Sequence, residues 1–138
     1  MLDLYSLPTG AYRSEILMVL RLAEQFLIRG EARARQNNIS GAQNDLNAIR
    51  TRAVLKSTTA NDMPSLLAAI QHERQVELFT EWGHRWLDLK RVGAIDAVMN
   101  GVTPLKANGV AWQPFQQLYP LLTNDLIKDA NLVQNSGY

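Results

Sequence analysis

Apolar residues in the first part of the chain recur every three or four positions, the spacing of one face of an α-helix. Over residues 12–37 this face consists of Ile16, Val19, Leu20, Ala23, Phe26 and Leu27. The segment contains no proline and one glycine, Gly30. The pattern therefore predicts a long helix over residues 12–37.

The other side of this predicted helix alternates apolar residues with charges of both signs. This second stripe consists of Leu17, Arg21, Glu24, Ile28, Glu31 and Arg35. A helix that is apolar around most of its circumference packs on more than one side. We therefore expect Arg21 and Glu24 to form ion pairs rather than to lie free in solvent.

A second helix is predicted to pack against the first as a hairpin. Asn37 and Asn38 end the first helix, and Ser40 with Gln43 has the spacing of a capping box. The new apolar face consists of Ala42, Leu46, Ile49 and Ala53. With Gly30 in the first helix, these small and large residues approximate half of the tetratricopeptide consensus, of which one copy is visible.

A third helix is predicted after the polar loop of residues 56–61 and runs to about Trp82. Asp62 can cap this helix, and Pro64 fits its first turn. Its apolar stripe includes Arg74, and a cation in an apolar stripe requires a carboxylate partner. The candidate partners are Glu77 and Glu81 on the same helix, or Glu24 and Glu31 across the core.

Beyond Gly83 the predicted helices become short and then give way to irregular chain. Helices are expected over residues 84–92 and 94–99, and a last one over residues 124–129 with Thr123 as N-cap. The sequence thus predicts one all-α domain over 1–138. Residues 1–99 form tetratricopeptide-like helical hairpins, and residues 100–138 form a long, mostly irregular region that large aromatic residues anchor.

Composition narrows the class of protein. The 138 residues, with 46% hydrophobic content, suffice for one domain with a core. A net charge of +1 gives no field that would select nucleic acid. The arginines of the first two helices are interleaved with Glu31 and Asp45, so a paired or solvated face is expected rather than a phosphate-binding patch.

The absence of cysteine excludes a disulfide framework, a thiolate metal site and a cysteine nucleophile. The first residues do not have the pattern of a signal peptide. The most apolar stretch, residues 16–28, is broken by Arg21 and Glu24, so it is not expected to cross a membrane. The chain as written is therefore expected to be soluble.

Three carboxylates, Glu73, Glu77 and Glu81, recur at i, i+4 and i+8 and could serve as acid and base or bind a cation. Neighbours on one helix cannot oppose each other across a substrate, so ion pairs with Arg74, Arg85 or Lys90 are the favoured interpretation. Glu81 and His84 have the Glu-x-x-His spacing of di-iron bundles, but two histidines in the whole chain cannot complete such a site. We expect no metal, no cofactor and no catalysis.

Tryptophans offer a different candidate chemistry. Trp82 and Trp86, four positions apart on a helix, are expected in the core. Trp112 lies in a region rich in glycine and proline, where an exposed ring could stack on a sugar. The alternative is that Trp112 anchors otherwise irregular chain. Trp112 is the one candidate ligand-binding residue.

Three linked stretches resemble a known family. They read LRLAEQFLIRGEA with LNAIRTRA at residues 20–32 and 46–53, IQHERQVEL with GHRWLDLKR at residues 70–78 and 83–91, and NLVQNSGY at residues 131–138. Together they resemble the C-terminal part of the SusD/RagB family, the surface glycan-binding lipoproteins of Bacteroidetes. The positions that we interpret as structural signature residues are Arg21, Glu24, Glu31, Arg50, Glu73, Arg74, Glu77, Arg85, Asp88, Arg91, Asn135 and Tyr138.

The resemblance implies a helical scaffold and a non-catalytic role. Family members capture oligosaccharide or another nutrient at the outer membrane and work with a TonB-dependent transporter of SusC type. They are several times longer and begin with a signal peptide and a lipidated cysteine. The resemblance therefore implies that this chain is a C-terminal fragment, attached to the membrane only through the lipid anchor of a longer parent. The alternative function is a small tetratricopeptide-like adaptor that binds a peptide.

Overall fold

The computed structural model describes residues 20–106 and 109–138, and these residues form helices and connecting segments without a strand. The helices are α1 (Leu22–Arg35), α2 (Ile39–Arg52), α3 (Met63–Glu77), α4 (His84–Arg91), α5 (Ile95–Lys106), the 3₁₀-helix η1 (Pro114–Gln117) and α6 (Thr123–Lys128). The predicted all-α fold is confirmed. None of the helices in the described ranges has the length and apolar character needed to span a bilayer.

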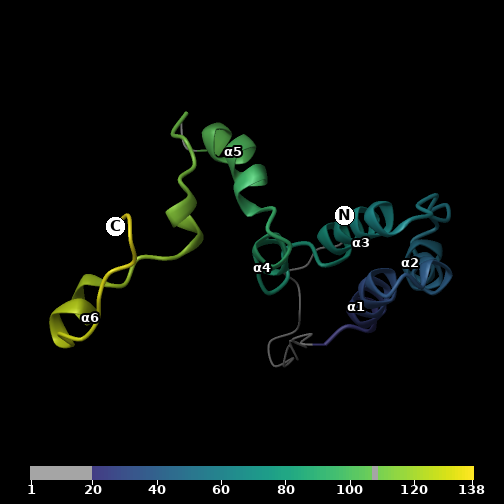
Figure 1. The fold of residues 1–138 in the computed structure, drawn as a ribbon, viewed down its shortest axis with the longest axis horizontal. Helices are drawn as coiled ribbons and strands as arrows, with labels where there is room; N and C mark the ends of the chain where they lie inside the picture. Colours follow the sequence, from purple (N-terminus) through teal and green to yellow (C-terminus); the bar gives the residue numbers. More distant parts are fainter. Residues whose placement is uncertain (1–19, 107–108) are drawn as a thin grey trace, which may run out of the picture.

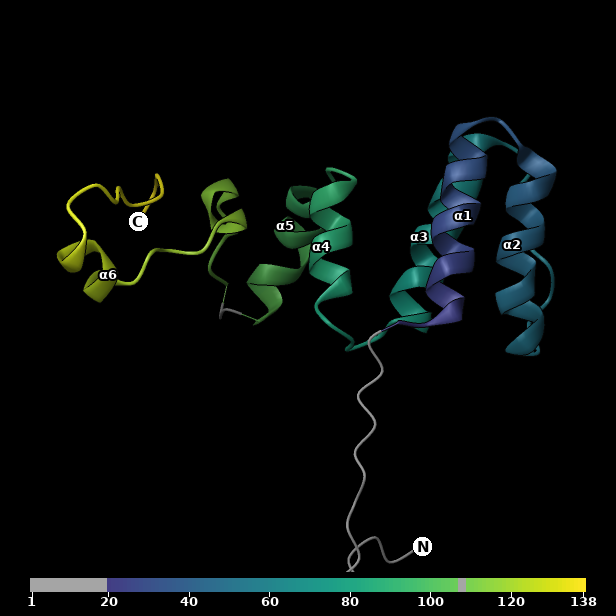
Figure 2. The same cartoon turned by 90° about the horizontal axis from the view of Figure 1, so that it is seen from below.

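The elements are arranged along one direction (Figures 1 and 2). Helices α1, α2 and α3 lie side by side at one end, α4 and α5 follow, and the segment with η1 and α6 extends to the other end. Helices α1 and α2 form the predicted antiparallel hairpin. Helix α3 is antiparallel to α1, because Arg21 at the start of α1 is bonded to Glu77 at the end of α3.

The main core lies between the first three helices. Its buried members are Ala23, Leu27, Ala34, Ala42, Leu46, Ile49, Leu66 and Ile70. Gly30 allows the helices to approach, because a Cβ atom at this position would lie 3.3 Å from the Cβ atom of Asp45 and 3.6 Å from Ile70 Cδ1. Gly30 therefore lies close to both α2 and α3.

Two predicted helix starts differ from the structure. Arg21 has an extended backbone, with φ of −119° and ψ of 130°, so α1 begins at Leu22 and no single helix continues through residues 20 and 21. The predicted helical part before residue 20, with Ile16, Leu17 and Val19, lies outside the described residues. The capping box of Ser40 with Gln43 is wrong, because Asn38 is the N-cap of α2 and accepts the Gly41 N–H at 3.0 Å. The predicted Asp62 cap of α3 is confirmed, and Asp62 accepts the Ser65 N–H at 2.8 Å.

Three boundaries in the second half also need correction. Helix α3 ends at Glu77 and not near Trp82, because Thr80 and Trp82 have positive φ. Helix α5 continues to Lys106 with Pro104 inside it, so the irregular region does not begin at residue 100. The first part of α5, with Ile95, Val98 and Met99, packs in a second core. Helix α6 begins at Thr123 itself, and Leu122 is its N-cap.

The loop of residues 54–61 turns back along α2 and is fixed to it by side chains from one helix face. Arg50 Nε donates to the Lys56 carbonyl at 2.9 Å, and Gln43 Nε2 donates to the Ala60 carbonyl at 2.7 Å. Between them, Asn47 Oδ1 accepts the Thr58 N–H at 2.8 Å. These bonds return the chain to the end of the hairpin where α3 starts.

Val54 follows the end of α2 in a left-handed conformation, with φ of 59°. The Val54 N–H donates to the Thr51 carbonyl and the Leu55 N–H to the Arg50 carbonyl, which is the Schellman pattern of helix ends. Glycine is the usual residue at this position, because a β-branched side chain is strained there.

Replacing Val54 by glycine is expected to raise the free energy of unfolding by about 1 kcal/mol, because the left-handed conformation costs a non-glycine residue about 1–2 kcal/mol. Val54 is 92% exposed, so the change removes little buried surface. Chemical denaturation followed by circular dichroism measures the effect. As a control, Ala48→Gly on the exposed side of α2 should lower stability by about 1 kcal/mol. A loss of stability in Val54→Gly would contradict the proposed strain.

Candidate functional site

A chain of ion pairs joins α1, α3 and α4, and Arg74 is its centre. The residue is 6% exposed. Its Nε donates to Asp88 Oδ2 at 2.7 Å, and its Nη2 donates to Glu24 Oε1 at 3.4 Å. The predicted contact of Arg74 with a carboxylate is therefore confirmed for Glu24. The shorter bond to Asp88 was not predicted, because it crosses from α3 to α4 over a turn of residues 78–83.

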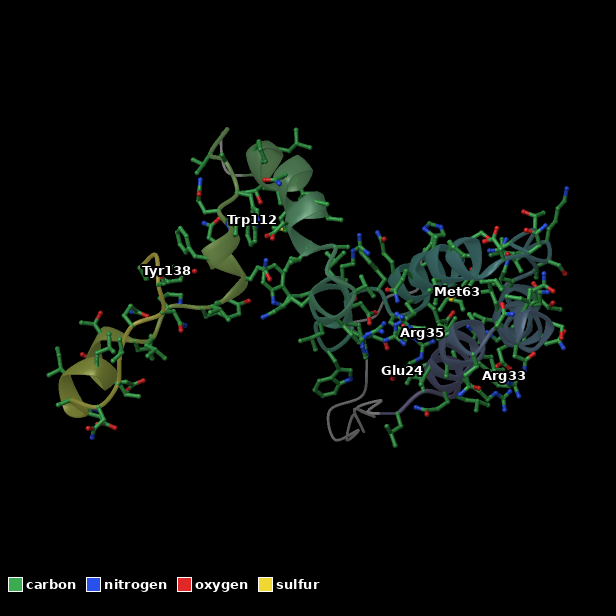
Figure 3. All side chains as sticks on the ribbon, in the orientation of Figure 1. Glu24, Arg33, Arg35, Met63, Trp112 and Tyr138 are labelled. Carbon is green, nitrogen blue, oxygen red and sulfur yellow. The ribbon has the colours of Figure 1, made fainter. Side chains whose placement is uncertain are left out.

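Glu31 of α1 continues the same chain of ion pairs through Arg91 of α4. Arg91 donates to its two carboxylate oxygens at 2.7 and 2.9 Å, and Arg35 donates to Oε1 at 2.9 Å. Burial raises the pKa of Glu31, but the hydrogen bonds and charges of Arg91 and Arg35 outweigh burial and bring the pKa below its usual value. In Figure 3, Glu24 and Arg35 lie on the side of α1 toward α4, and Arg33 lies on the side toward α2.

The low pKa of Glu31 predicts a specific pH dependence. Because the pKa is lower in the folded state than in the unfolded state, the ionised carboxylate stabilises the fold above about pH 4.3. That contribution is lost as the pH falls through the folded-state pKa. The stability difference between the protein and Glu31→Gln should therefore shrink from about pH 7 to about pH 3, measured by urea denaturation. A difference that stays constant over this range would contradict the assignment.

The row of Glu73, Glu77 and Glu81 is paired, as expected, but with arginines from outside α3. Arg21 binds Glu77 through its guanidinium and binds Glu81 Oε1 at 2.7 Å. Arg50 binds Glu73 Oε2 at 2.9 Å, and Arg52 binds Glu77 Oε2 at 2.5 Å. The expectation that Arg21 and Glu24 are paired is confirmed.

The other two expected partners of this row lie elsewhere. Lys90 Nζ donates to the Gln117 carbonyl at 2.9 Å. Arg85 is exposed, and within residues 20–106 and 109–138 it has no carboxylate within ion-pair distance. Arg74 pairs with Glu24 and Asp88 and not with this row. The predicted pairing of the carboxylate row with Arg74, Arg85 or Lys90 is therefore wrong.

Asp45 is a buried carboxylate whose importance the sequence pattern did not indicate. It is 2% exposed and accepts from Arg29 Nη2 at 2.7 Å and from Arg33 Nη1 at 2.8 Å. Both arginines come from α1, one helical turn apart, so Asp45 fixes the register of the α1–α2 hairpin. The expected paired face of arginines is confirmed here.

Trp112 belongs to a second, small core with Leu89 and Ile95. It is 8% exposed, its Nε1 donates to Asp96 Oδ1 at 2.8 Å, and its ring meets Trp86 edge to face at 6.2 Å. Figure 3 shows it beside α5. The structure therefore supports an anchor at Trp112, and a buried ring has no face available for a sugar. Trp86 packs against this core as predicted, but the expected core position of Trp82 is wrong, because Trp82 is 55% exposed.

Asn135 and Tyr138 close the C-terminal segment onto itself. Asn135 Nδ2 donates to the Tyr119 carbonyl at 2.6 Å, and Tyr138 Oη donates to the Leu118 carbonyl at 2.7 Å. The Tyr138 ring also meets Phe115 edge to face at 5.0 Å. No side chain of residues 113–138 is buried, so these contacts and the bonds of Gln134 hold the segment in place of a core.

A hollow of about 380 Å³ opens beside the ion pairs and is lined by Ile28, Glu31, Ala32, Arg35, Arg74 and Arg91. Its charged walls are already bonded to each other. Among residues 20–106 and 109–138, no three histidine or acidic side chains gather in a way that could hold a metal ion. The charged residues around this hollow therefore connect the helices through ion pairs.

Comparison with known proteins agrees with this description. The model of the SusD family matches residues 3–138. The chain belongs to the SusD family. A SusD-like protein from Bacteroides fragilis NCTC 9343 has a similar solved structure, with 26% sequence identity and a TM-score of 0.67 over 86% of this chain. Among curated proteins, none matches the chain.

This chain spans 25% of the length of the solved SusD-like protein. The matching fold confirms the helical scaffold with tetratricopeptide-like hairpins that the resemblance implied. The signature residues Arg74, Asp88 and Arg91 form ion pairs within this scaffold.

Proposed function

We propose that this chain takes part in the non-catalytic capture of an oligosaccharide at the surface of a bacterial cell. The observation that carries the proposal is the SusD-family match over residues 3–138 together with the matching fold. The ion pairs of Arg74 with Asp88 and of Arg91 with Glu31 support a rigid scaffold that presents a binding surface. Rigid presentation favours binding, because less conformational entropy is lost on association.

The absence of catalysis is part of this proposal. The carboxylates of α3 are engaged by arginines of neighbouring helices, and Glu31, with its lowered pKa, stays ionised at neutral pH. A general acid or base requires a pKa near the working pH and an open path to substrate. Carboxylates held in this way stabilise the fold and do not transfer protons to a ligand.

The proposal extends to the partner and the location, with the family match as its support. We place the chain as one domain, residues 1–138, in the C-terminal part of a longer lipid-anchored protein of the outer membrane. That protein delivers its ligand to a TonB-dependent transporter of SusC type. The 25% coverage of the solved SusD-like protein supports this placement, since most of that protein has no counterpart here.

Calorimetric titration tests the proposal. We expect saturable binding of at least one of maltohexaose, cellohexaose, xylohexaose and laminarihexaose to the full chain. Peptides of acidic, basic and neutral composition serve as the comparison, because a tetratricopeptide-like adaptor would bind peptides. Binding of a peptide but of no saccharide would replace nutrient capture by the adaptor function.

A further inference from the structure

The turn of residues 78–83, which joins α3 to α4, exposes two aromatic side chains. Phe79 is 73% exposed and Trp82 is 55% exposed. Leu78, at the start of the turn, is 2% exposed and anchors it on the inside. Exposed aromatic residues next to a buried anchor suggest a surface that is kept for binding.

The backbone of this turn is strained in a way that favours a functional interpretation. It consists of two consecutive turns, in which the Glu81 N–H donates to the Leu78 carbonyl at 3.2 Å and the His84 N–H donates to the Glu81 carbonyl at 3.0 Å. The central residues of the second turn, Trp82 and Gly83, have φ of 45° and 72°. Positive φ at both central positions is the pattern of a type I′ turn, in which glycine, asparagine and aspartate predominate.

Tryptophan is therefore an unusual residue at this position. Thr80 in the first turn also has a positive φ, of 62°. Such conformations cost about 1–3 kcal/mol for each residue and persist when the surrounding structure fixes them. Asparagine at either position would relieve strain and remove exposed apolar surface. The aromatic side chain at position 82 is therefore kept at a cost in backbone strain.

Helix α1 holds the turn in place. Arg21, directly before α1, donates to the Glu77 carbonyl at 2.6 Å and to Glu81 Oε1 at 2.7 Å. One end of the turn and its middle are thereby fixed by a single guanidinium. The aromatic residues are presented on a preorganised support, which lowers the entropic cost of binding a ligand.

We propose that the turn of residues 78–83 is a saccharide-binding site, in which Phe79 and Trp82 pack against the apolar face of a neutral pyranose ring. This inference rests on the proposed function. Aromatic rings supply large apolar contact at low entropic cost, and a few polar groups fix the orientation of the ligand. The polar groups here are the Thr80 hydroxyl, the Glu81 carboxylate, whose side chain is 33% exposed, and the exposed Arg85.

Substitution of Trp82 tests this site with little risk to the fold. Trp82→Gly suits the positive φ of the position, so the variant should remain folded. We expect it, and Phe79→Ala, to weaken binding of the tightest of the four hexasaccharides about tenfold or more. The control Tyr119→Ala removes an aromatic residue that is 77% exposed in the C-terminal segment and should leave affinity unchanged.

The variant Trp82→Phe adds a fluorescence measurement that distinguishes contact with the saccharide from a purely structural role of Trp82. It keeps an aromatic face and removes the exposed indole, so calorimetry should still detect binding while saccharide-dependent quenching of tryptophan fluorescence is lost. If Trp82→Gly and Phe79→Ala bound the saccharide as tightly as the unchanged protein, the proposed site would be wrong. The proposal that the chain captures a saccharide would not be affected. The turn would then be a contact surface for protein. Failure of the unchanged protein to bind any of the four saccharides would overturn both proposals.

Discussion

Replacement of Arg74 by methionine is expected to lower the free energy of unfolding by about 3–5 kcal/mol, because it takes away the nearest cation of a buried carboxylate and an ion pair with Glu24. The Asp88 side chain is 9% exposed and receives the Arg74 Nε–H at 2.7 Å. The Asp88 carboxylate is largely shielded from bulk water. Its second cation, Arg91, is less close, at 3.2 Å from the other carboxylate oxygen. Urea denaturation followed by circular dichroism gives the difference.

Arg35→Met is the matched control for this prediction. Arg35 is 55% exposed and Glu31 keeps Arg91 when Arg35 is removed, so the loss should not exceed about 1 kcal/mol. The double variant Arg74→Met with Asp88→Leu should recover part of the loss, because the stranded charge is removed as well. Equal losses in Arg74→Met and Arg35→Met would show that Arg74 is not the centre of a buried ion-paired interface.

Truncation of Leu27 to alanine is expected to lower the free energy of unfolding by about 3 kcal/mol, because it leaves a cavity at a fully buried position. Leu27 is 0% exposed and lies in the core between α1, α2 and α3. The same substitution at Leu22, one and a half turns earlier on α1, serves as control. Leu22 is 73% exposed, and its truncation should change stability by less than about 0.5 kcal/mol.

This pair of variants also tests how α1 is oriented. If Leu22→Ala proved as costly as Leu27→Ala in thermal and urea denaturation, the side of α1 with Leu22 would be buried in solution. The assignment of the core to the face with Ala23, Leu27 and Ala34 would then be wrong.

The parts of the fold that could be predicted are those in which local pattern and tertiary packing agree. The spacing of Leu27, Leu46 and Ile49 placed each of them on a buried face, and each is in the core. Arg74 in an apolar stripe required a carboxylate, since an unpaired buried charge is too costly, and the structure supplies two.

The features that could not be predicted depend on contacts between distant parts of the chain. The row of Glu73, Glu77 and Glu81 was expected to pair with Arg74, Arg85 or Lys90. Instead Arg21, Arg50 and Arg52 reach it, because the start of α1 and the end of α2 lie beside it. No local pattern gives the relative position of helix ends. The shorter bond of Arg74, to Asp88, escaped prediction for the same reason.

Trp82 shows a second kind of limit. Its spacing from Trp86 fits one helix face, but the helix ends at Glu77 and positive φ at Thr80 breaks the periodicity. Helical spacing has no meaning across such a break, so the ring that was expected in the core is exposed. The reverse holds for Trp112, whose glycine- and proline-rich surroundings gave no sign of its buried bond to Asp96.

We propose that this SusD-family chain itself binds a saccharide. Nuclear magnetic resonance tests this binding most directly. Amide chemical shifts of the uniformly labelled 138-residue chain are followed while each of the four hexasaccharides is added. Saturable shifts are expected with at least one of them, largest in residues 78–83. An unchanged spectrum with all four saccharides, at concentrations up to the millimolar range, would contradict this proposal.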